Sequence, residues 1–273
     1  MTRVRDALAA AAARLGEVSD TARLDAELLM AHALGVEREA LLMSLLDTGV
    51  PDAFEPLVQR RLAAEPVAYI TGRRGFWTIE LEVGPGMLVP RPDSETLIEA
   101  ALDRFGTAGP STILDLGTGP GTLLLAALDQ WPASTGLGVD RSEAALTAAR
   151  RNAERLGLAE RATFRLDDWG AGIAERFDLL LCNPPYVETG AMLPRDVAEW
   201  EPAEALFAGA DGLDDYRRLA PQVQGLLAPE GLGCVEIGAD QAEAAGALFK
   251  AAGLSVSVRR DLGGRPRCLL LWA

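Results

Sequence analysis

The sequence predicts a mixed α/β protein in which an open, mostly parallel sheet carries helices on both faces and a small helical bundle precedes it. From about residue 92, short apolar strands alternate with helical segments, as in sheets built from strand–helix–strand units. Before about residue 65 the apolar spacing is helical. A length of 273 residues suits one large and one small domain. We therefore expect a helical domain at residues 1–65, a hairpin linker at 66–91 and the sheet domain at 92–273.

The expected helical bundle is delimited by capping and helix-breaking residues. Within the expected helices, apolar residues recur at the spacing that places them on one helix face. The expected boundaries, in chain order, are Thr2 as the first cap, Asp20 or Thr21 as the second start, Gly35 as its end, a short helix over residues 39–46, and Pro51 as the start of the last helix.

The region after the bundle changes character. Residues 66–72 and 76–83 are short apolar stretches with Gly-rich turns, which predict extended segments and a hairpin between the two domains. The last two expected strands, at 254–260 and 268–272, are joined by a short connection, so the final strand should run antiparallel. The other expected strands are 112–116, 136–139, 163–166, 179–182 and 233–237, with helices at 121–130, 143–156, 215–227 and 241–252.

Composition argues against several classes of protein. No run of about 18 apolar residues occurs, so no membrane span is expected. Arg3 and Arg5 precede an Ala-rich run that resembles a secretion signal only loosely, because Asp6 and Arg14 interrupt the pattern, so we expect a cytoplasmic protein. The formal net charge of -14 disfavours binding to nucleic acid mainly through phosphates.

The cysteine and histidine content gives no sign of a metal site. Cys182, Cys234 and Cys268 are scattered and form no Cys-x-x-Cys pair, and the only histidine is His32 on an expected helix. Buried free thiols in a reducing compartment are the simplest interpretation, and we expect no bound metal.

A Gly-rich turn follows the first strand of the sheet domain. The turn reads Gly117, Thr118, Gly119, Pro120, Gly121, and it leads into an expected helix. Glycines allow a tight turn and let a ligand lie against bare backbone. Such turns also serve nicotinamide and flavin cofactors, or simply connect two elements, so the turn alone does not identify a ligand.

The next two strands end in acidic residues. Asp140 lies about 20 residues beyond the glycines, where a carboxylate can accept hydrogen bonds from two ribose hydroxyls and would repel a 2′-phosphate. Asp167 and Asp168 end the third strand; one of them can accept from an exocyclic adenine amine, with Trp169 covering the base, or they are solvated loop acids. This order resembles the class I methyltransferases, which implies a Rossmann-like, seven-stranded sheet binding S-adenosylmethionine.

The fourth strand ends in the most specific stretch of the chain. Asn183, Pro184, Pro185 and Tyr186 follow an apolar strand, and the two prolines stiffen the loop and remove two backbone donors. The Asn183 side-chain oxygen and the Pro184 carbonyl then form adjacent acceptors for the two protons of an NH2 group. An amide nitrogen is planar and a poor nucleophile, and these acceptors orient it and bind more strongly as positive charge develops on it. Tyr186 can lie against the planar group.

This Asn-Pro-Pro-Tyr sequence also occurs in enzymes that methylate adenine N6 or guanine amines, so other segments must decide the substrate. Several of them resemble the HemK/PrmC family of release factor N5-glutamine methyltransferases, and with the helical module the resemblance spans essentially the whole chain. Besides Asn183–Tyr186, the stretches are residues 66–72, 88–95, 201–207, 211–216 and 235–238.

The resemblance implies methyl transfer from S-adenosylmethionine to the N5 amide nitrogen of the glutamine in the Gly-Gly-Gln motif of class 1 peptide chain release factors. It implies that the helical module contacts the release factor, and that the partner is this protein rather than nucleic acid or membrane; we expect a monomer. Carried onto matching positions, the cofactor would be held by Gly117, Thr118, Gly119, Pro120, Gly121, Asp140, Asp168, Trp169 and Asn183, and the glutamine by Asn183, Pro184, Pro185 and Tyr186.

The chain departs from the family pattern at three positions. Pro120 stands where Ser is usual and removes a backbone donor and a hydroxyl from the cofactor turn. Cys182 replaces Ser or Ala, and Ser94 replaces Thr. Only Pro120 bears on cofactor affinity.

Two other functions fit the sequence less well. An N6-adenine DNA or RNA methyltransferase would need a recognition region rich in Lys, Arg and aromatic residues, whereas the extra module here is compact and mixed in charge. A non-catalytic scaffold that binds S-adenosylmethionine would be expected to have lost Asn183 or the glycines, and both are present.

Overall fold

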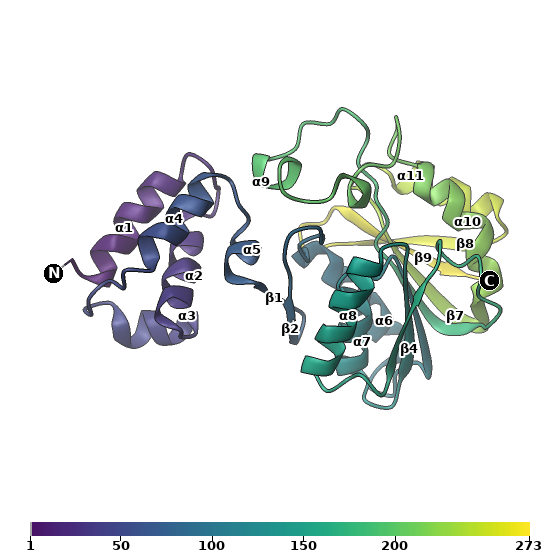
Figure 1. Cartoon of the computed structure of the whole chain (residues 1–273). Coiled ribbons are helices and arrows are strands. Elements are labelled where there is room, and N and C mark those ends of the chain that lie inside the picture. Colours follow the sequence, from purple (N-terminus) through teal and green to yellow (C-terminus); the bar gives the residue numbers. More distant parts are fainter. Residues whose placement is uncertain (1) are drawn as a thin grey trace. The chain divides into compact units, whose positions relative to one another are not determined.

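A computed structural model describes residues 2–273 of the chain (Figure 1). The contacts within it define two compact units. One contains the chain up to Arg73 together with Leu193–Glu201, and the other contains Arg74–Met192 and Pro202–Ala273. In the part of the chain that the structure describes, no helix is both long and apolar enough to cross a bilayer. The division into a recognition module, a hairpin linker and a methyltransferase domain at residues 65 and 91 stays a prediction.

The first unit is a helical bundle around one apolar core. Buried side chains of the first two helices, among them Leu8, Leu15 and Leu29, pack with Phe54 and Val58 of a later helix. The helices are α1 (Val4–Leu15), α2 (Ala22–Leu34), α3 (Arg38–Ala40), the π-helical turn η1 (Leu41–Leu45), α4 (Phe54–Leu62), α5 (Val67–Thr71) and α9 (Arg195–Ala198).

The boundaries of these helices confirm some predictions and correct others. Gly35 ends α2 in the left-handed conformation, with φ of 67°. Thr2 does not cap α1, because the capping position is Arg3, and α4 begins at Phe54 rather than at Pro51. Residues 66–72 were expected to be extended, but α5 occupies Val67–Thr71. A short apolar run does not distinguish strand from helix by periodicity.

A buried ion pair holds the helical unit together. Arg61 is 4% exposed, and its Nε donates to Asp25 Oδ2 at 2.8 Å. Its Nη2 donates to Asp196 Oδ2 at 3.1 Å, and its Nη1 to the Glu65 carbonyl at 3.3 Å. Three separate parts of the chain are therefore held by one guanidinium group, and one of them is the returning segment Leu193–Glu201.

The second unit contains the predicted seven-stranded sheet, in the order β5-β4-β3-β6-β7-β9-β8. All pairs from β5 to β7 are parallel, and β9 pairs antiparallel with both β7 and β8, which confirms the expected reversal of the last strand. The strands are β3 (Thr112–Leu116), β4 (Thr135–Asp140), β5 (Ala162–Leu166), β6 (Phe177–Cys182), β7 (Leu227–Glu236), β8 (Ser255–Arg260) and β9 (Pro266–Trp272).

Helices cover both faces of this sheet (Figure 1). One layer is α6 (Glu95–Phe105), α7 (Thr122–Gln130) and α8 (Glu143–Arg155), and the other is α10 (Asp214–Leu226) and α11 (Ala242–Ala251). Since β3, β4, β5 and β6 are parallel, their carboxyl ends meet at one edge of the sheet, where open α/β sheets bind their ligands.

A hairpin is present, but its strands are β1 (Arg73–Phe76) and β2 (Ile79–Glu82), which form a two-stranded sheet, and not the expected segments 66–72 and 76–83. Buried Asn152 of α8 links β2 to the Gly-rich turn: its Oδ1 accepts from the Glu82 amide at 2.7 Å, and its Nδ2 donates to the carbonyls of Glu82 at 3.1 Å and Pro120 at 3.0 Å. This side chain thus satisfies three backbone groups, two in β2 and one in the Gly-rich turn, which are distant in sequence.

Candidate active site

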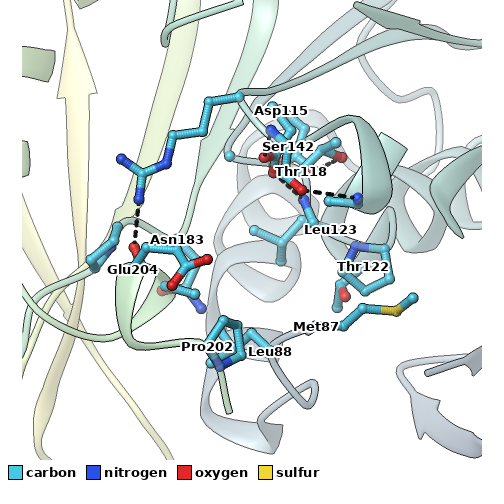
Figure 2. A pocket seen from close by; sticks show the side chains of 18 of the residues that line it. Met87, Leu88, Asp115, Thr118, Thr122, Leu123, Ser142, Asn183, Pro202 and Glu204 are labelled. Carbon is cyan, nitrogen blue, oxygen red and sulfur yellow. Dashed lines mark hydrogen bonds between the residues drawn. The ribbon is translucent and has the colours of Figure 1, made fainter. Parts of the chain in front are cut away.

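A deep cavity opens at the carboxyl edge of the sheet. It encloses about 1090 Å³ of space free of protein atoms, its open mouth included, which is enough for a nucleoside-sized ligand. Figure 2 shows Asp115, Thr118 and Ser142 gathered at one end of it, with Met87, Leu88 and Pro202 at the other. Of the predicted site residues, the cavity is lined by Gly117, Thr118, Gly119, Pro120, Asp140, Asp168, Trp169, Asn183 and Pro185.

The Gly-rich turn has a backbone that only glycine adopts without strain. Gly117, Gly119 and Gly121 have φ of 73°, 55° and 91°. The amides of Gly117 and Thr118 both donate to the Val139 carbonyl at 2.9 Å, which ties the turn to the end of β4. Gly121 does not line the cavity; it precedes α7, and a Cβ there would lie 2.7 Å from Leu125 Cδ1. Its left-handed backbone requires glycine, and an added Cβ would meet a side chain of the helix that it precedes.

Asp140, at the end of β4, holds the turn from the other side. Its Oδ2 accepts from the Gly119 amide at 2.9 Å, and its Oδ1 accepts from the Ser142 amide at 2.9 Å. Each carboxylate oxygen can accept a second hydrogen bond. The side chain can therefore fix the turn and still receive hydroxyl groups of a ligand.

Asp168 and Trp169 line the cavity after β5, but their surroundings differ from the expectation. Arg218 Nη2 lies 2.6 Å from both carboxylate oxygens of Asp168, so this acid shares its acceptor capacity with a cation. Trp169 has φ of 56°, an uncommon conformation for a residue other than glycine. Its ring lies against the turn, since a Cβ on Gly117 would be 3.1 Å from Cζ3, and its buried Nε1 has no hydrogen-bond partner in residues 2–273.

Asn183–Tyr186 follow β6 at the same edge. Asn183 Nδ2 donates to Ser94 Oγ at 3.2 Å, and among the described residues no donor reaches its Oδ1. The side-chain oxygen is thus available as an acceptor. A second cavity of about 330 Å³ adjoins the first and is lined by Leu88, Arg91, Asn183, Pro184, Tyr186, Val187, Ala205 and Leu206. The four predicted residues are therefore divided between the two cavities, with Asn183 in both.

Asp115 lines the larger cavity and was missed from the sequence. It is 1% exposed; its Oδ2 accepts from Thr118 Oγ1 at 2.7 Å and from the Leu124 amide at 3.2 Å, while its buried Oδ1 has no partner among the described residues. Burial raises the pKa of Asp115 to about 7, against the opposing effect of these two hydrogen bonds. An unpartnered buried acceptor of this kind suits a cationic ligand group.

Ser94 contacts Asn183, and Glu236 contacts Tyr186. The sequence did not identify either of them as a site residue. Tyr186 Oη donates to Glu236 Oε1 at 3.1 Å, and burial raises the pKa of Glu236 to about 7. A sequence signal existed for both acids, because Asp115 and Glu236 each interrupt an otherwise apolar strand. Ser94 lies within a stretch that was noted only for its family resemblance.

Several further lining residues come from loops whose convergence the sequence does not reveal. Arg141 Nη2 donates to the Glu204 carbonyl at 2.9 Å, joining the loop after β4 to the segment that contains Pro202 (Figure 2). Met87 and Leu88 come from the loop after the hairpin. In the described chain, no group of three or more His, Cys, Asp or Glu residues is arranged to hold a metal ion.

Comparison with known families matches two regions of the chain. Residues 6–72 match the PrmC N-terminal domain, and residues 110–236 match a methyltransferase domain. Proteins named release factor glutamine methyltransferase are similar over nearly the whole length. The one from Rhodospirillum rubrum is 46% identical over 91% of this chain and 78% of its own, and the one from Cereibacter sphaeroides is 45% identical over 97% and 96%. That from Pseudomonas aeruginosa is 42% identical over 93% and 94%.

Solved structures share the fold at low sequence identity. A methyltransferase from Pyrococcus furiosus aligns with a TM-score of 0.55 and 18% identity over 80% of this chain and 98% of its own. A 16S rRNA methyltransferase from Thermus thermophilus, solved with AdoMet and guanosine, aligns with a TM-score of 0.53 and 19% identity over 73% and 49%. Together they confirm the Rossmann-like methyltransferase fold.

Proposed function

Because this chain belongs to the release factor glutamine methyltransferase family, we propose that it methylates the side-chain amide nitrogen of a glutamine in a peptide chain release factor. It is an S-adenosylmethionine-dependent methyltransferase. The observation that carries the proposal is the Asn183 side chain, whose Nδ2 is bound by Ser94 while its Oδ1 remains free to accept from a substrate NH2.

The residues around the larger cavity fit S-adenosylmethionine. Its cationic amino group would find the unpartnered Oδ1 of Asp115, and its ribose hydroxyls would find Asp140. Trp169 offers an apolar surface beside the turn for a base. When bound, the cofactor supplies a methyl group on a positively charged sulfur. Gly117 and Gly119 present only backbone at the turn, so neither adds a side chain that would obstruct a ligand there.

The chain's own contribution to the reaction is to hold the acceptor. Asn183 Oδ1 and the Pro184 carbonyl would accept the two protons of the glutamine NH2 in the smaller cavity, and Tyr186 would contact its plane. The acceptors favour the transition state, because the N–H groups become stronger donors as the nitrogen gains positive charge. Since the amide proton becomes acidic once the new bond is forming, no strong base is needed beforehand.

The finer assignments extend this proposal. The substrate glutamine would be that of the Gly-Gly-Gln motif of class 1 release factors, and residues 1–65 would contact the release factor away from the reacting group. Selectivity would then come from a surface larger than three residues. We further propose that the enzyme acts as a monomer in the cytoplasm and that Gly117–Gly121, Asp140, Asp168 and Trp169 hold the cofactor.

The decisive experiment incubates the purified chain with S-adenosylmethionine and a full-length release factor, and then maps modified peptides by mass spectrometry. We expect one added methyl group on the Gly-Gly-Gln peptide, and none on a release factor whose motif glutamine is replaced by glutamate. Asn183→Ala is the matched enzyme control. Transfer of labelled methyl to DNA or RNA, with the release factor unmodified, would reject the proposal in favour of an N6-adenine methyltransferase.

A further inference from the structure

Beside the Asn183 amide lie further polar groups, Ser94 and the Glu236 carboxyl, whose part in the reaction has not been described so far. Asn183 Nδ2 donates to Ser94 Oγ at 3.2 Å, and Ser94 is 2% exposed at the start of α6. Ser94 lies beside the Glu236 carboxyl, where its hydroxyl favours the charged form of the acid. Tyr186 Oη donates to Oε1 of the same carboxyl at 3.1 Å.

The direction of these hydrogen bonds follows from the chemistry of the groups. An ionised carboxylate only accepts, so Tyr186 donates its hydroxyl proton to Glu236 Oε1, and the charged form of Glu236 favours a Ser94 hydroxyl whose proton points toward the carboxyl. The Ser94 oxygen is then left to accept, and the group it accepts from is Asn183 Nδ2. This orientation of the amide places Asn183 Oδ1 at the cavity.

We propose that Glu236 is a positioning residue that sets the orientation of the Asn183 amide through Ser94, so that an oxygen rather than an NH2 group faces the substrate. A donor at this position would oppose the substrate NH2 and prevent productive binding. The inference rests on the proposed function for its meaning in catalysis, but the orientation of the amide is a property of the enzyme itself.

The position of Glu236 supports a dedicated role. It is 1% exposed at the end of β7, where the preceding residues Leu232, Cys234 and Val235 are buried and apolar. Its Oε2 is buried and has no hydrogen-bond partner among the described residues. A buried acid with one unsatisfied oxygen is costly to the fold.

Two buried acids near this loop have a pKa of about 7, Glu236 and Asp115, and the Glu236→Gln variant separates the effect of Glu236 from that of Asp115. Arg267 on β9 lowers the pKa of Glu236 and Asp93 raises it, while burial dominates and raises it to about 7. The other titratable groups near it are neutral in this range, because burial raises the pKa of each: Tyr186, Tyr216, Cys182 and Cys268. Protonation turns the carboxyl into a donor, so the orientation of Asn183 should be lost as pH falls through about 7.

The chain offers a direct spectroscopic test, because Asn152 and Asn183 are its only asparagines. Selective 15N-asparagine labelling gives two side-chain NH2 signals, which Asn183→Ala assigns. We expect the Asn183 signal to shift with a midpoint near pH 7 and the Asn152 signal to stay constant, since Asn152 bonds only to backbone groups. In Glu236→Gln and in Ser94→Ala the Asn183 signal should no longer titrate.

Activity provides the second readout. Glu236→Gln and Ser94→Ala should each lower kcat by about 10²-fold, as expected for misplacement of a group that holds the reacting atom, with cofactor affinity nearly unchanged. The residual rate of Glu236→Gln should lose its dependence on pH, and Ser94→Thr, which keeps the hydroxyl, should restore most activity. Asp178→Asn is the matched control: it alters a carboxylate at the other end of β6 and should keep both kcat and the titration of Asn183.

The possible results separate the two proposals. If wild-type enzyme fails to methylate a release factor but the Asn183 signal titrates and depends on Glu236, only the proposed function is lost. If release factor is methylated while Glu236→Gln keeps wild-type kcat and an unchanged Asn183 signal, the positioning role of Glu236 is wrong.

Discussion

Two buried carboxylates of the helical unit differ from two that lie at the carboxyl edge of the sheet. In the helical unit, Asp25 and Glu27 are almost fully buried, and each is paired with arginine: Arg61 binds Asp25, and Arg23 and Arg38 bind Glu27. Burial acts to raise the pKa of Glu27, but the two arginines outweigh it and the net pKa is lowered. Both acids therefore have arginine partners, as expected where an ion pair serves the fold.

At the edge of the sheet, Asp115 and Glu236 are as deeply buried, but each has one oxygen without a partner among the described residues. Burial raises the pKa of both to about 7. Perturbed and incompletely satisfied acids of this kind cluster at functional sites. The contrast teaches that a buried carboxylate paired with arginine stabilises its unit. A buried carboxylate with an unpartnered oxygen instead serves to bind a ligand or to orient a neighbouring side chain.

The largest expected effect comes from breaking the pair in the helical unit. Arg61→Met leaves Asp25 buried without its cation and should destabilise this unit by about 3–5 kcal/mol. Native-state hydrogen exchange of the α2 amides measures the loss unit by unit. Arg195→Met, which removes an exposed pair with Glu199 in the same unit, should leave exchange unchanged. Equal exchange in Arg61→Met and wild type would show that the buried pair does not stabilise the unit.

Asn183→Ala should lower turnover and leave stability unchanged, whereas Arg61→Met should lower stability. Loss of one preorganised group that binds the transition state costs about 10²–10³-fold in kcat, or roughly 2.7–4 kcal/mol. Single-turnover methylation measures the rate, and calorimetry with S-adenosylmethionine should give a nearly unchanged affinity. A parallel loss of cofactor affinity would mean that Asn183 chiefly holds the cofactor.

The unpartnered oxygen of Asp115 predicts that cofactor affinity depends on pH. If the cationic amino group binds the ionised acid, a pKa of about 7 in the free enzyme means that binding releases a proton, so affinity rises with pH below 7 and levels off above it. From pH 6 to 7.5 the gain should be about eightfold, since the ionised fraction grows by that factor. Calorimetry in buffers of different ionisation enthalpy checks the proton release. Asp115→Asn should bind weakly at every pH, and a flat wild-type profile would contradict the assignment.

The same acid predicts the direction of a stability change in the free protein. Its pKa is raised from 3.8 in the unfolded chain to about 7, so the folded state holds the proton more tightly. Stability of the sheet unit should therefore fall as pH rises from about 4 to about 7, in contrast to Glu27, whose lowered pKa adds stability above its unfolded value. Denaturant midpoints of wild type and Asp115→Asn across this range measure the difference, which should be absent in the variant.

The smallest effect is expected at the turn itself. Pro120→Ser adds a backbone donor and a hydroxyl next to Gly119, but the Pro120 carbonyl already bonds Asn152, so the turn is well held without them. Cofactor affinity should change by no more than about 1 kcal/mol, the typical worth of one hydrogen bond. A gain much larger than this, measured by calorimetry, would show that Pro120 weakens the site substantially.

Much of the sheet unit could be predicted from the sequence because its signals are local. The strands, the antiparallel end, the Gly-rich turn and the loop Asn183–Tyr186 each arise from a few consecutive residues whose backbone preferences agree. The cavity brings most of the predicted residues together, although Gly121 supports packing and Asp168 is engaged by Arg218. Helix α5 was mistaken for an extended segment because five residues are too few for periodicity to decide.

The sequence by itself determined the order of strands and helices, the conformation of the Gly-rich turn and the stiff acceptor loop, since these depend on neighbouring residues. Only the tertiary structure decided that Ser94, Asn183 and Glu236 share one chain of polar groups, that Asp115 keeps an oxygen without a partner, and that Arg61 holds residues 193–201 to the helical unit. The reason is physical: burial and hydrogen-bond direction depend on which distant segments pack together, and no local pattern encodes that.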